Sequence, residues 1–189
     1  MKTFFSEKHK LRDANTELYG GELVKPFERP QRLDFIVDEI KTRGLGEILN
    51  PNKVNLNIIG KVHDQDYIKF LDNAWNEWTK EGFKGEAIPT VWPSRSMNSE
   101  KIPTFIEGKL GYYSLAGETS ISNGSIEAAY EAVRVAISAV DTLVKDKLSG
   151  IFALCRPPGH HASKNQYGGY CFFNNAACLL YTSPSPRDN

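Results

Sequence analysis

The chain has 189 residues, and its 23 lysines and arginines are balanced by 23 aspartates and glutamates. This length suits one sizeable domain, and the lack of net positive charge argues against nucleic acid or an anionic membrane as a partner. Because the N-terminal segment soon becomes polar and no window holds the roughly 18 apolar residues of a membrane helix, we expect a cytoplasmic protein.

The first part of the chain predicts a short strand, a long loop and two helices. Residues 3–5 are the strand candidate, and residues 7–30 form a polar loop of a length that is usually functional. Apolar residues recur at the helical period over residues 32–42 and 64–78. Alternation of apolar and polar residues over residues 54–59 predicts a further strand between these helices. For the second helix, Asp64 is a candidate N-cap.

The second part predicts an α/β unit. Residues 80–124 lack a sustained period but are rich in aromatic residues, so we expect an ordered excursion that packs on its own domain or on a second subunit. Residues 125–148 form the clearest helix, with Ser125 as its N-cap. Residues 151–155 are a continuous apolar run typical of a buried parallel strand. Ligands lie at the carboxyl ends of such strands, which makes the loop of residues 156–169 the expected place for a site.

Two adjacent histidines, His160 and His161, follow this strand in the run Arg156-Pro-Pro-Gly-His-His161. An imidazole is the natural general acid or base near neutral pH. The glycine before the pair permits a tight turn that brings both rings to one pocket. A pair of polar loop residues is the alternative interpretation, but the Pro-Pro-Gly corner at a strand exit favours a catalytic pair.

The next segment is Gly168-Gly-Tyr-Cys-Phe-Phe-Asn-Asn175. Its two glycines indicate close backbone approach or positive φ. Tyr170, beside the glycines, is the candidate for lining a site, whereas Phe172 and Phe173 suit a core strand. Asn174 and Asn175 are candidate caps of a helix that begins near residue 176.

These two motifs closely resemble the histone deacetylase superfamily. Five further segments are similar to its acetylpolyamine amidohydrolase branch, and the match runs from about residue 3 to residue 177. The segments are Phe5-Ser-Glu-Lys-His-Lys-Leu-Arg12, Thr16-Glu-Leu-Tyr-Gly-Gly-Glu22, Val62-His-Asp64 with Tyr67, Ala87-Ile-Pro-Thr-Val-Trp-Pro93 and Gly108-Lys-Leu-Gly-Tyr-Tyr113.

The resemblance implies a three-layer α/β/α arginase/deacetylase-like fold with a parallel sheet, truncated in this chain. It also implies a zinc-dependent deacetylase that hydrolyses an acetyl-amide. Within that activity, His161 matches the general base and then acid, and His160 matches its electrostatic partner. Tyr170 matches an aromatic wall of the substrate tunnel.

The resemblance further implies a small cationic acetylated amine as substrate. Glu17, Tyr19 and Glu107 resemble the edge that contacts polyamines, where carboxylates suit ammonium groups. Each of these carboxylates also fits a solvated loop residue, which is the commoner fate. Glu118 is a weaker candidate of the same kind.

The implied zinc ligands, two aspartates and a histidine, belong to later strands, so we expect no metal ligand in this chain. The resemblance implies a homodimer of the full-length form, to which residues 80–120 contribute. We expect residues 1–177 to be the N-terminal part of a histone deacetylase-like domain, inactive alone. Residues 178–188 match a one-frame translation of a sequencing adapter, which predicts that residues 178–189 are a non-native tail; a genuine Ser-Pro-rich tail is the alternative.

Two other functions stay open at this point. One is a lysine deacetylase that acts on protein, which a shallow site would favour and a confined site lined by Glu17 and Glu107 would disfavour. The other is a non-catalytic zinc-binding module, although no pair of cysteines has the close Cys-x₂₋₄-Cys spacing. Its ligands would be Cys155, His160 or His161, Cys171 and Cys178.

Overall fold

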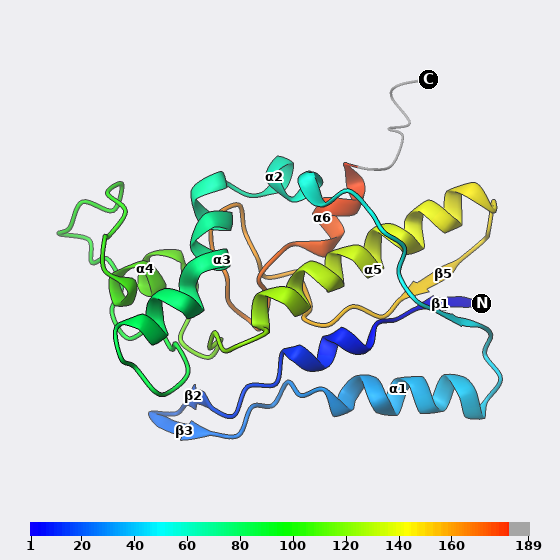
Figure 1. Ribbon diagram of the computed structural model, residues 1–189, viewed down its shortest axis with the longest axis horizontal. Helices are drawn as coiled ribbons and strands as arrows, with labels where there is room; N and C mark the ends of the chain where they lie inside the picture. Colours follow the sequence, from blue (N-terminus) through cyan, green and yellow to red (C-terminus); the bar gives the residue numbers. More distant parts are fainter. Residues whose placement is uncertain (182–189) are drawn as a thin grey trace.

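The computed structural model describes residues 1–181 and is built around a small parallel sheet (Figure 1). The strands β4 (Ile48–Leu49), β1 (Lys2–Phe4) and β5 (Ile151–Ala153) lie side by side in that order. Thr3 pairs with Ile48 on one side and with Phe152 on the other. The first strand of the chain is therefore the central one.

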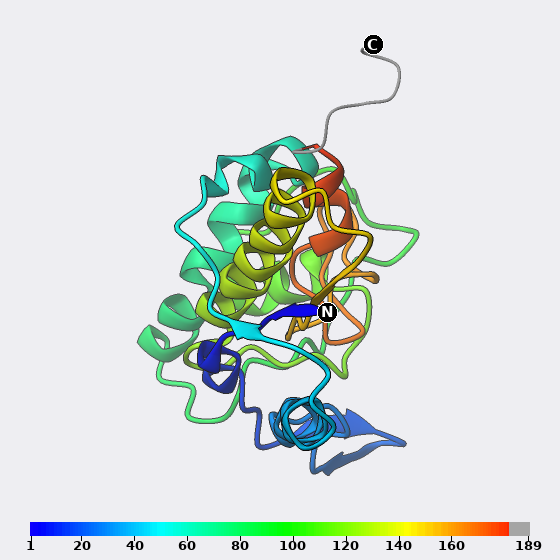
Figure 2. The ribbon, with the colours of Figure 1, turned by 90° about the vertical axis from the view of Figure 1, so that its right-hand side faces the viewer.

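The sheet is the middle of three layers. On one face, α1 (Gln31–Thr42) covers a cluster that includes Phe5, Leu33 and Phe152. On the other face, α5 (Ser125–Lys145) covers Phe4 and Ile151. Alternate strand residues point to opposite faces, and Figure 2 shows the strands between the two helices. This is the α/β/α layering that was expected.

The largest core lies beside α5 rather than on the sheet. It is formed by α3 (Gln65–Lys80), α4 (Ile106–Tyr113) and the segment that leads into α6 (Asn175–Leu180). Phe172 and Phe173 are almost fully buried in it, as predicted for core residues. The Asn174 side chain accepts a hydrogen bond from the Ala177 backbone N–H at 3.0 Å, which confirms this asparagine as the cap of the last helix.

The segment predicted as a long loop, residues 7–30, contains regular structure. A 3₁₀ helix, η1 (Glu7–Leu11), is followed by an antiparallel hairpin of β2 (Glu17–Tyr19) and β3 (Glu22–Val24). Gly20 and Gly21, with φ of 60° and 85°, form its turn. Two consecutive residues with positive φ are the requirement of a tight hairpin turn, and glycine meets it without steric cost.

The predicted strand over residues 54–59 is wrong. A 3₁₀ turn, η2 (Leu56–Ile58), and α2 (Ile59–Val62) occupy the segment. The Asn55 side chain accepts the Asn57 backbone N–H at 2.9 Å. Asparagine side chains that bond to nearby backbone compete with a strand ladder and favour helix starts, which explains the difference.

Two predicted helix caps are also wrong in detail. The N-cap of α5 is Gly124, not Ser125. Glycine suits this position because φ is 81° there and a Cβ would lie 2.6 Å from the Leu11 carbonyl oxygen. Asp64 occupies the N-cap position of α3, but its side chain makes no capping bond and instead pairs with Lys164 at 3.0 Å.

The excursion of residues 80–124 is ordered, as expected. Ala87 and Ile121 exchange two backbone hydrogen bonds of 2.9 Å, and the Trp92 indole N–H donates to the Ser114 hydroxyl at 2.8 Å. In the part of the chain that the structure describes, no helix is both long and apolar enough to cross a bilayer. The expected boundary after residue 177 falls inside α6 and stays a prediction, while residues 182–189 of the expected tail lie outside the described residues.

Candidate active site

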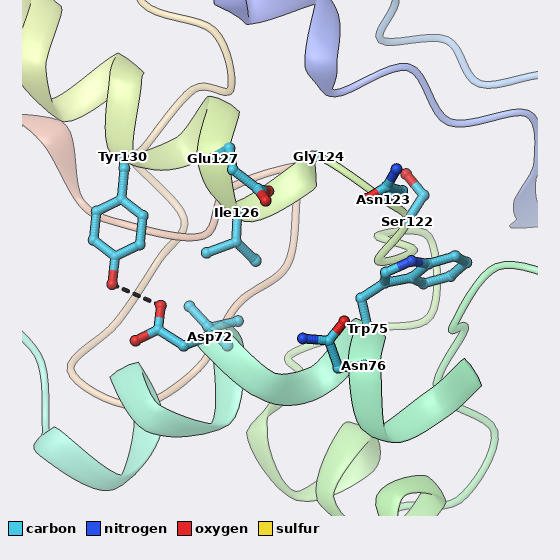
Figure 3. A pocket seen from close by; sticks show the side chains of 10 residues that line it. Asp72, Trp75, Asn76, Ser122, Asn123, Gly124, Ile126, Glu127 and Tyr130 are labelled. Carbon is cyan, nitrogen blue, oxygen red and sulfur yellow. Dashed lines mark hydrogen bonds between the residues drawn. The ribbon is translucent and has the colours of Figure 1, made fainter. Parts of the chain in front are cut away.

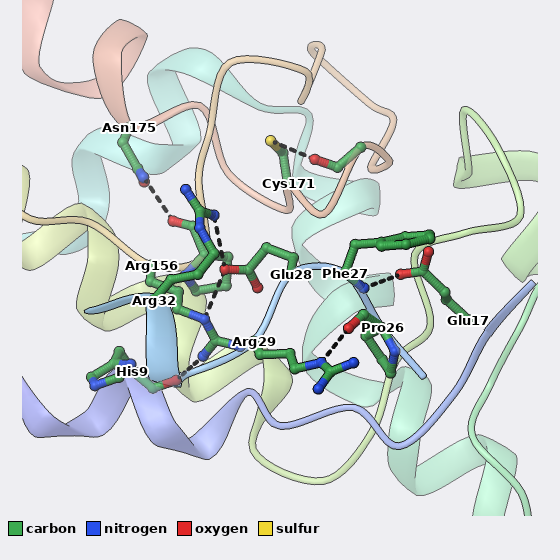
Figure 4. A network of polar contacts seen from close by, with 12 residues as sticks. His9, Glu17, Pro26, Phe27, Glu28, Arg29, Arg32, Arg156, Cys171 and Asn175 are labelled. Atoms are coloured by element: carbon green, nitrogen blue, oxygen red, sulfur yellow. Dashed lines mark hydrogen bonds and ion pairs between the residues drawn. The ribbon is translucent and has the colours of Figure 1, made fainter. Parts of the chain in front are cut away.

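The corner that follows β5 is anchored by a buried arginine. Arg156 Nε donates to Glu28 Oε1 at 2.9 Å, and its Nη1 donates to the His9 carbonyl (Figure 4). Both side chains of this ion pair are almost fully buried. A charge in the interior persists only when it is paired and hydrogen-bonded. Arg156 therefore fixes the start of the corner and does not point into a site.

Gly159 lets the corner pass close to the start of α6. A Cβ at this position would lie 2.5 Å from the Asn175 backbone nitrogen and 2.6 Å from the Phe173 carbonyl oxygen. The two residues that follow are exposed, and the rings of His160 and His161 lie with centroids 4.3 Å apart and planes at 56°. The turn thus brings both imidazoles to one place, as the sequence predicted.

The second glycine of the Gly-Gly-Tyr motif lies directly against this histidine pair. Gly169 has φ of 55°, and a Cβ there would lie 2.3 Å from His161 Cδ2. Cys171 joins the two segments from behind, since its Sγ accepts the His161 N–H at 3.4 Å and donates to the Gly169 carbonyl at 3.3 Å. The imidazole of His161 is therefore packed on backbone and held from its own main chain.

Tyr170 is held at both ends in an unusual backbone conformation. Its φ is 65°, a region that residues other than glycine adopt at a cost. Its backbone N–H donates to the Thr119 hydroxyl at 2.8 Å, and its phenol donates to Glu17 Oε1 at 3.2 Å. Partial burial and the neighbouring Glu17 raise the pKa of Tyr170 to about 12, so the phenol remains a donor.

Glu17 is the carboxylate that the Tyr170 phenol contacts, and Glu17, Tyr170 and Glu118 are called the acidic wall from here on. Its side chain belongs to a residue that is only 2 % exposed, and its Oε2 accepts the Phe27 N–H at 3.2 Å. Glu118, the weaker sequence candidate, lies at the same turn, where its Oε1 accepts the Gly169 N–H at 2.6 Å. The structure therefore brings together Glu17, Tyr170 and Glu118 next to the histidine pair.

Sequence reasoning missed Glu86, which sets the position of the segment that enters β2. Its two carboxylate oxygens accept the backbone N–H groups of Asn15 and Thr16 at 2.8 and 2.9 Å. The glutamate and its partners are about 70 residues apart in the chain. The Thr16 hydroxyl also donates to Glu86 Oε2, at 2.8 Å. No local pattern marks such a contact, because the partners are distant in the chain and most of them are backbone amides.

Two predicted substrate contacts are not joined to this cluster. Tyr19 is 63 % exposed on the hairpin and contacts the Phe27 ring edge-on at 5.4 Å. Glu107 is half-buried in the first turn of α4. Within residues 1–181, no hydrogen bond, ion pair or ring contact links Tyr19 or Glu107 to Glu17 or Tyr170.

The described residues do not fit a metal ion on their own. Across residues 1–181, no group of three or more histidine, cysteine, aspartate or glutamate side chains is placed to hold one. The alternative zinc module is therefore not formed by the residues proposed for it. Cys155, for example, is turned toward α5, where its Sγ donates to the Ala132 carbonyl at 3.4 Å.

A separate hollow lies between α3 and the start of α5, with a volume of about 170 Å³ (Figure 3). Asp72 on its rim accepts a hydrogen bond from the Tyr130 phenol at 2.8 Å. Its lining includes Trp75 and Glu127 but none of the residues of the histidine pair or the acidic wall. The hollow is thus not an extension of the candidate active site.

Comparisons with known proteins identify the family of the chain. The family profile described as Histone deacetylase domain matches residues 26–182. The acetylpolyamine amidohydrolase of Mycoplana ramosa is 50 % identical over 177 residues, which are 94 % of this chain and 51 % of that protein. Acetylpolyamine amidohydrolase 2 of Pseudomonas aeruginosa is 41 % identical over the same shares of both chains.

A solved structure extends the likeness to the fold. The crystal structure of acetylpolyamine aminohydrolase from Burkholderia pseudomallei superposes with a TM-score of 0.85 at 28 % identity, covering 96 % of this chain and 52 % of that one. The expected arginase/deacetylase-like α/β fold is thereby confirmed. The chain spans about half the length of the curated relatives that it matches.

Proposed function

Since the chain belongs to the histone deacetylase domain family, we propose that its residues form the proton-handling half of an enzyme that removes acetyl groups from acetylated polyamines. The relatives at 40–50 % identity carry the name acetylpolyamine amidohydrolase. The observation that carries the proposal is the pair of exposed imidazoles, 4.3 Å apart, at the exit of a parallel strand.

The two histidines have different tasks in this proposal. Hydrolysis of an amide needs a base that takes a proton from the attacking water and an acid that gives it to the leaving amine. His161 performs both steps, since its ring is fixed against Gly169. His160 lies beside it and balances the charge that develops during the reaction.

The acidic wall selects a cationic substrate. Glu17 and Glu118 lie on either side of the Gly169–Tyr170 turn and suit the ammonium groups of a polyamine. Tyr170 forms the aromatic wall next to the acetyl-amide, and Glu107 and Tyr19 are proposed to contact the far end of the substrate. A lysine deacetylase that acts on protein would have a shallow site, whereas the Glu17 carboxylate of this wall is buried. The substrate proposed here is therefore a small amine rather than an acetylated protein chain.

Zinc is part of the proposal for a protein of the relatives' full length. When bound, such a metal polarises the acetyl carbonyl. Residues 1–181 offer no set of ligands for it. We therefore propose that the ligands come from the half of the relatives' length that this chain does not match.

We also propose a homodimer and a cytoplasmic location. Val91, Met97 and Phe105 of the excursion are each about half exposed or more, which supports a surface that a second subunit covers. All three cysteines are free thiols, which is typical of a reducing compartment.

The test is a chimera in which residues 1–177 are joined to the second half of the Mycoplana ramosa relative. For a folded chimera we expect zinc-dependent release of putrescine from N-acetylputrescine. His161→Ala should lower kcat by about 100-fold or more, whereas Asn165→Ala, in an exposed position of the same loop, should leave it unchanged. Faster turnover of an acetyl-lysine peptide, or full activity of His161→Ala, would contradict the proposal.

A further inference from the structure

The loop that carries His160 and His161 runs from β5 to α6 with little regular structure of its own, and a buried histidine holds it. His63 lies between α2 and α3 and is only 2 % exposed. Its Nδ1 is 3.3 Å from the Lys164 carbonyl oxygen, and its Nε2 accepts the Asn174 N–H at 3.0 Å. One imidazole therefore contacts both ends of the segment that forms the Gly-Gly-Tyr turn.

These contacts define the protonation state of the ring. A backbone N–H is only a donor, so Nε2 of His63 must present its lone pair to Asn174. The hydrogen of a neutral imidazole then lies on Nδ1, where it donates to the Lys164 carbonyl. Protonation would remove the only acceptor that Asn174 has at this ring. Burial lowers the pKa of His63, which favours the same neutral form of the ring.

The surroundings of the ring are mostly aromatic. Tyr67 and Phe173 pack against it with centroids 5.5 Å away. The charge of Asp64 favours protonation of His63 against the stronger effect of burial, and Asp64 is itself paired with Lys164 at 3.0 Å. The Lys164 carbonyl also accepts the Asp64 backbone N–H at 3.0 Å, so that end of the loop is bonded twice to the α3 start.

Asn174 transmits the contact to the histidine pair. Its Nδ2 donates to the Ala162 carbonyl at 3.1 Å, while its Oδ1 caps α6. Ala162 directly follows His161. A chain of hydrogen bonds thus runs from the His63 ring through Asn174 to the backbone beside the proposed general base.

We propose that His63, as the neutral Nδ1–H tautomer, is a positioning residue for His160 and His161. The proposal rests on the proposed function only for the reaction in which the histidine pair takes part. The contacts of His63 do not depend on that function. His63 contacts no substrate and acts through Asn174 and Lys164. A merely structural histidine would stabilise the fold without affecting how His160 and His161 interact with each other.

The first measurement uses the 189-residue chain with ¹⁵N-labelled histidine. Long-range ¹H–¹⁵N spectra should assign His63 as the neutral Nδ1–H form, and its signals should stay constant between about pH 5 and 8, the range in which an unperturbed imidazole changes charge. An Nε2–H tautomer, or a His63 that titrates together with the exposed pair, would overturn the proposal. Because no turnover is measured, this result is independent of whether the protein is a deacetylase.

The second measurement compares three variants of the same chain. His63→Leu removes both bonds, whereas His63→Gln offers one acceptor and one donor in their place. Tyr67→Phe is the matched control, because it removes another buried hydrogen bond to the same segment, at Phe172. We expect His63→Leu to shift the titration midpoints of His160 or His161 by about half a unit or more, and His63→Gln to restore them.

Unchanged midpoints in a folded His63→Leu variant, or an equal shift in Tyr67→Phe, would reduce His63 to a structural role and refute the proposal. If His63→Leu does not fold, the tautomer assignment and the His63→Gln titration decide the question. A His63→Gln chain with displaced midpoints then counts against positioning through these two bonds.

Discussion

The loop that carries the histidine pair is held on two sides by different chemistry. On the N-terminal side the contacts involve charge, since Arg156 pairs with Glu28 and Tyr170 donates to Glu17. On the side of α3 the buried contacts are neutral, from His63 and Tyr67 to backbone groups, and charge enters only through the exposed Lys164–Asp64 pair among the described residues. The difference teaches that one site is held by a buried ion pair on one side and by neutral buried hydrogen bonds on the other, so that loss of a partner leaves an unpaired charge only on the first side.

Two buried histidines show the same contrast. His63 and His9 are both 2 % exposed. Both ring nitrogens of His63 are hydrogen-bonded, whereas neither ring nitrogen of His9 has a partner among the described residues. Burial and then the charge of Arg156 lower the pKa of His9 to about 4. The charged side of the site therefore contains its own acid-sensitive group.

The largest expected effect comes from breaking the buried ion pair of Arg156 and Glu28. Arg156→Met leaves Glu28 buried with only the exposed Arg32, 3.4 Å away, as a partner. We expect a loss of about 3–5 kcal/mol in the free energy of unfolding, the range for a buried pair that loses one member. Urea unfolding of the 189-residue chain measures it. The double variant Arg156→Met with Glu28→Leu should recover most of the loss, and a double variant as unstable as the single one would contradict this account.

The next effect concerns pH on the charged side. Between 6.5, the ordinary pKa of histidine, and about 4, the unfolded chain binds a proton at His9 that the folded chain does not. Stability therefore falls as the pH falls through this window, by up to about 3 kcal/mol in total. His9→Phe should flatten this dependence in unfolding curves measured at several pH values. His160→Gln, at an exposed histidine, is the control, and an equal flattening there would rule out His9 as the cause.

The smallest expected effect concerns a neutral hydrogen bond on the side of α3. Tyr67→Phe removes the buried bond to the Phe172 carbonyl, which is 2.7 Å long in the structure. We expect a loss of about 1–3 kcal/mol, because the carbonyl is left unsatisfied, and no change of this loss with salt. Tyr113→Phe is the matched control, since Tyr113 is also buried but its phenol has no hydrogen bond among the described residues. Equal losses in both variants would contradict the assigned role of the bond.

The sequence predicted the elements whose signal is local. The helices α1, α3 and α5 follow from periodic apolar residues, and the histidine pair follows from its corner at a strand exit. The contacts of Glu86 and His63 escaped prediction because their hydrogen-bond partners lie 70 or more residues away and most of them are backbone groups. Glu107 was the stronger candidate from sequence and Glu118 the weaker one, and only the fold places Glu118 against Gly169.

The central place of β1 has a consequence for synthesis. Lys2–Phe4 are made first and find their β4 partner soon afterwards, but the β5 partner is Ile151–Ala153. While the ribosome makes the residues between, one edge of β1 has no strand to pair with and Phe4 has no α5 to cover it. Open strand edges and uncovered apolar groups are the features that lead nascent chains to aggregate. Translation speed and chaperone access before residue 151 emerges should therefore govern the yield of this protein more than its final stability does.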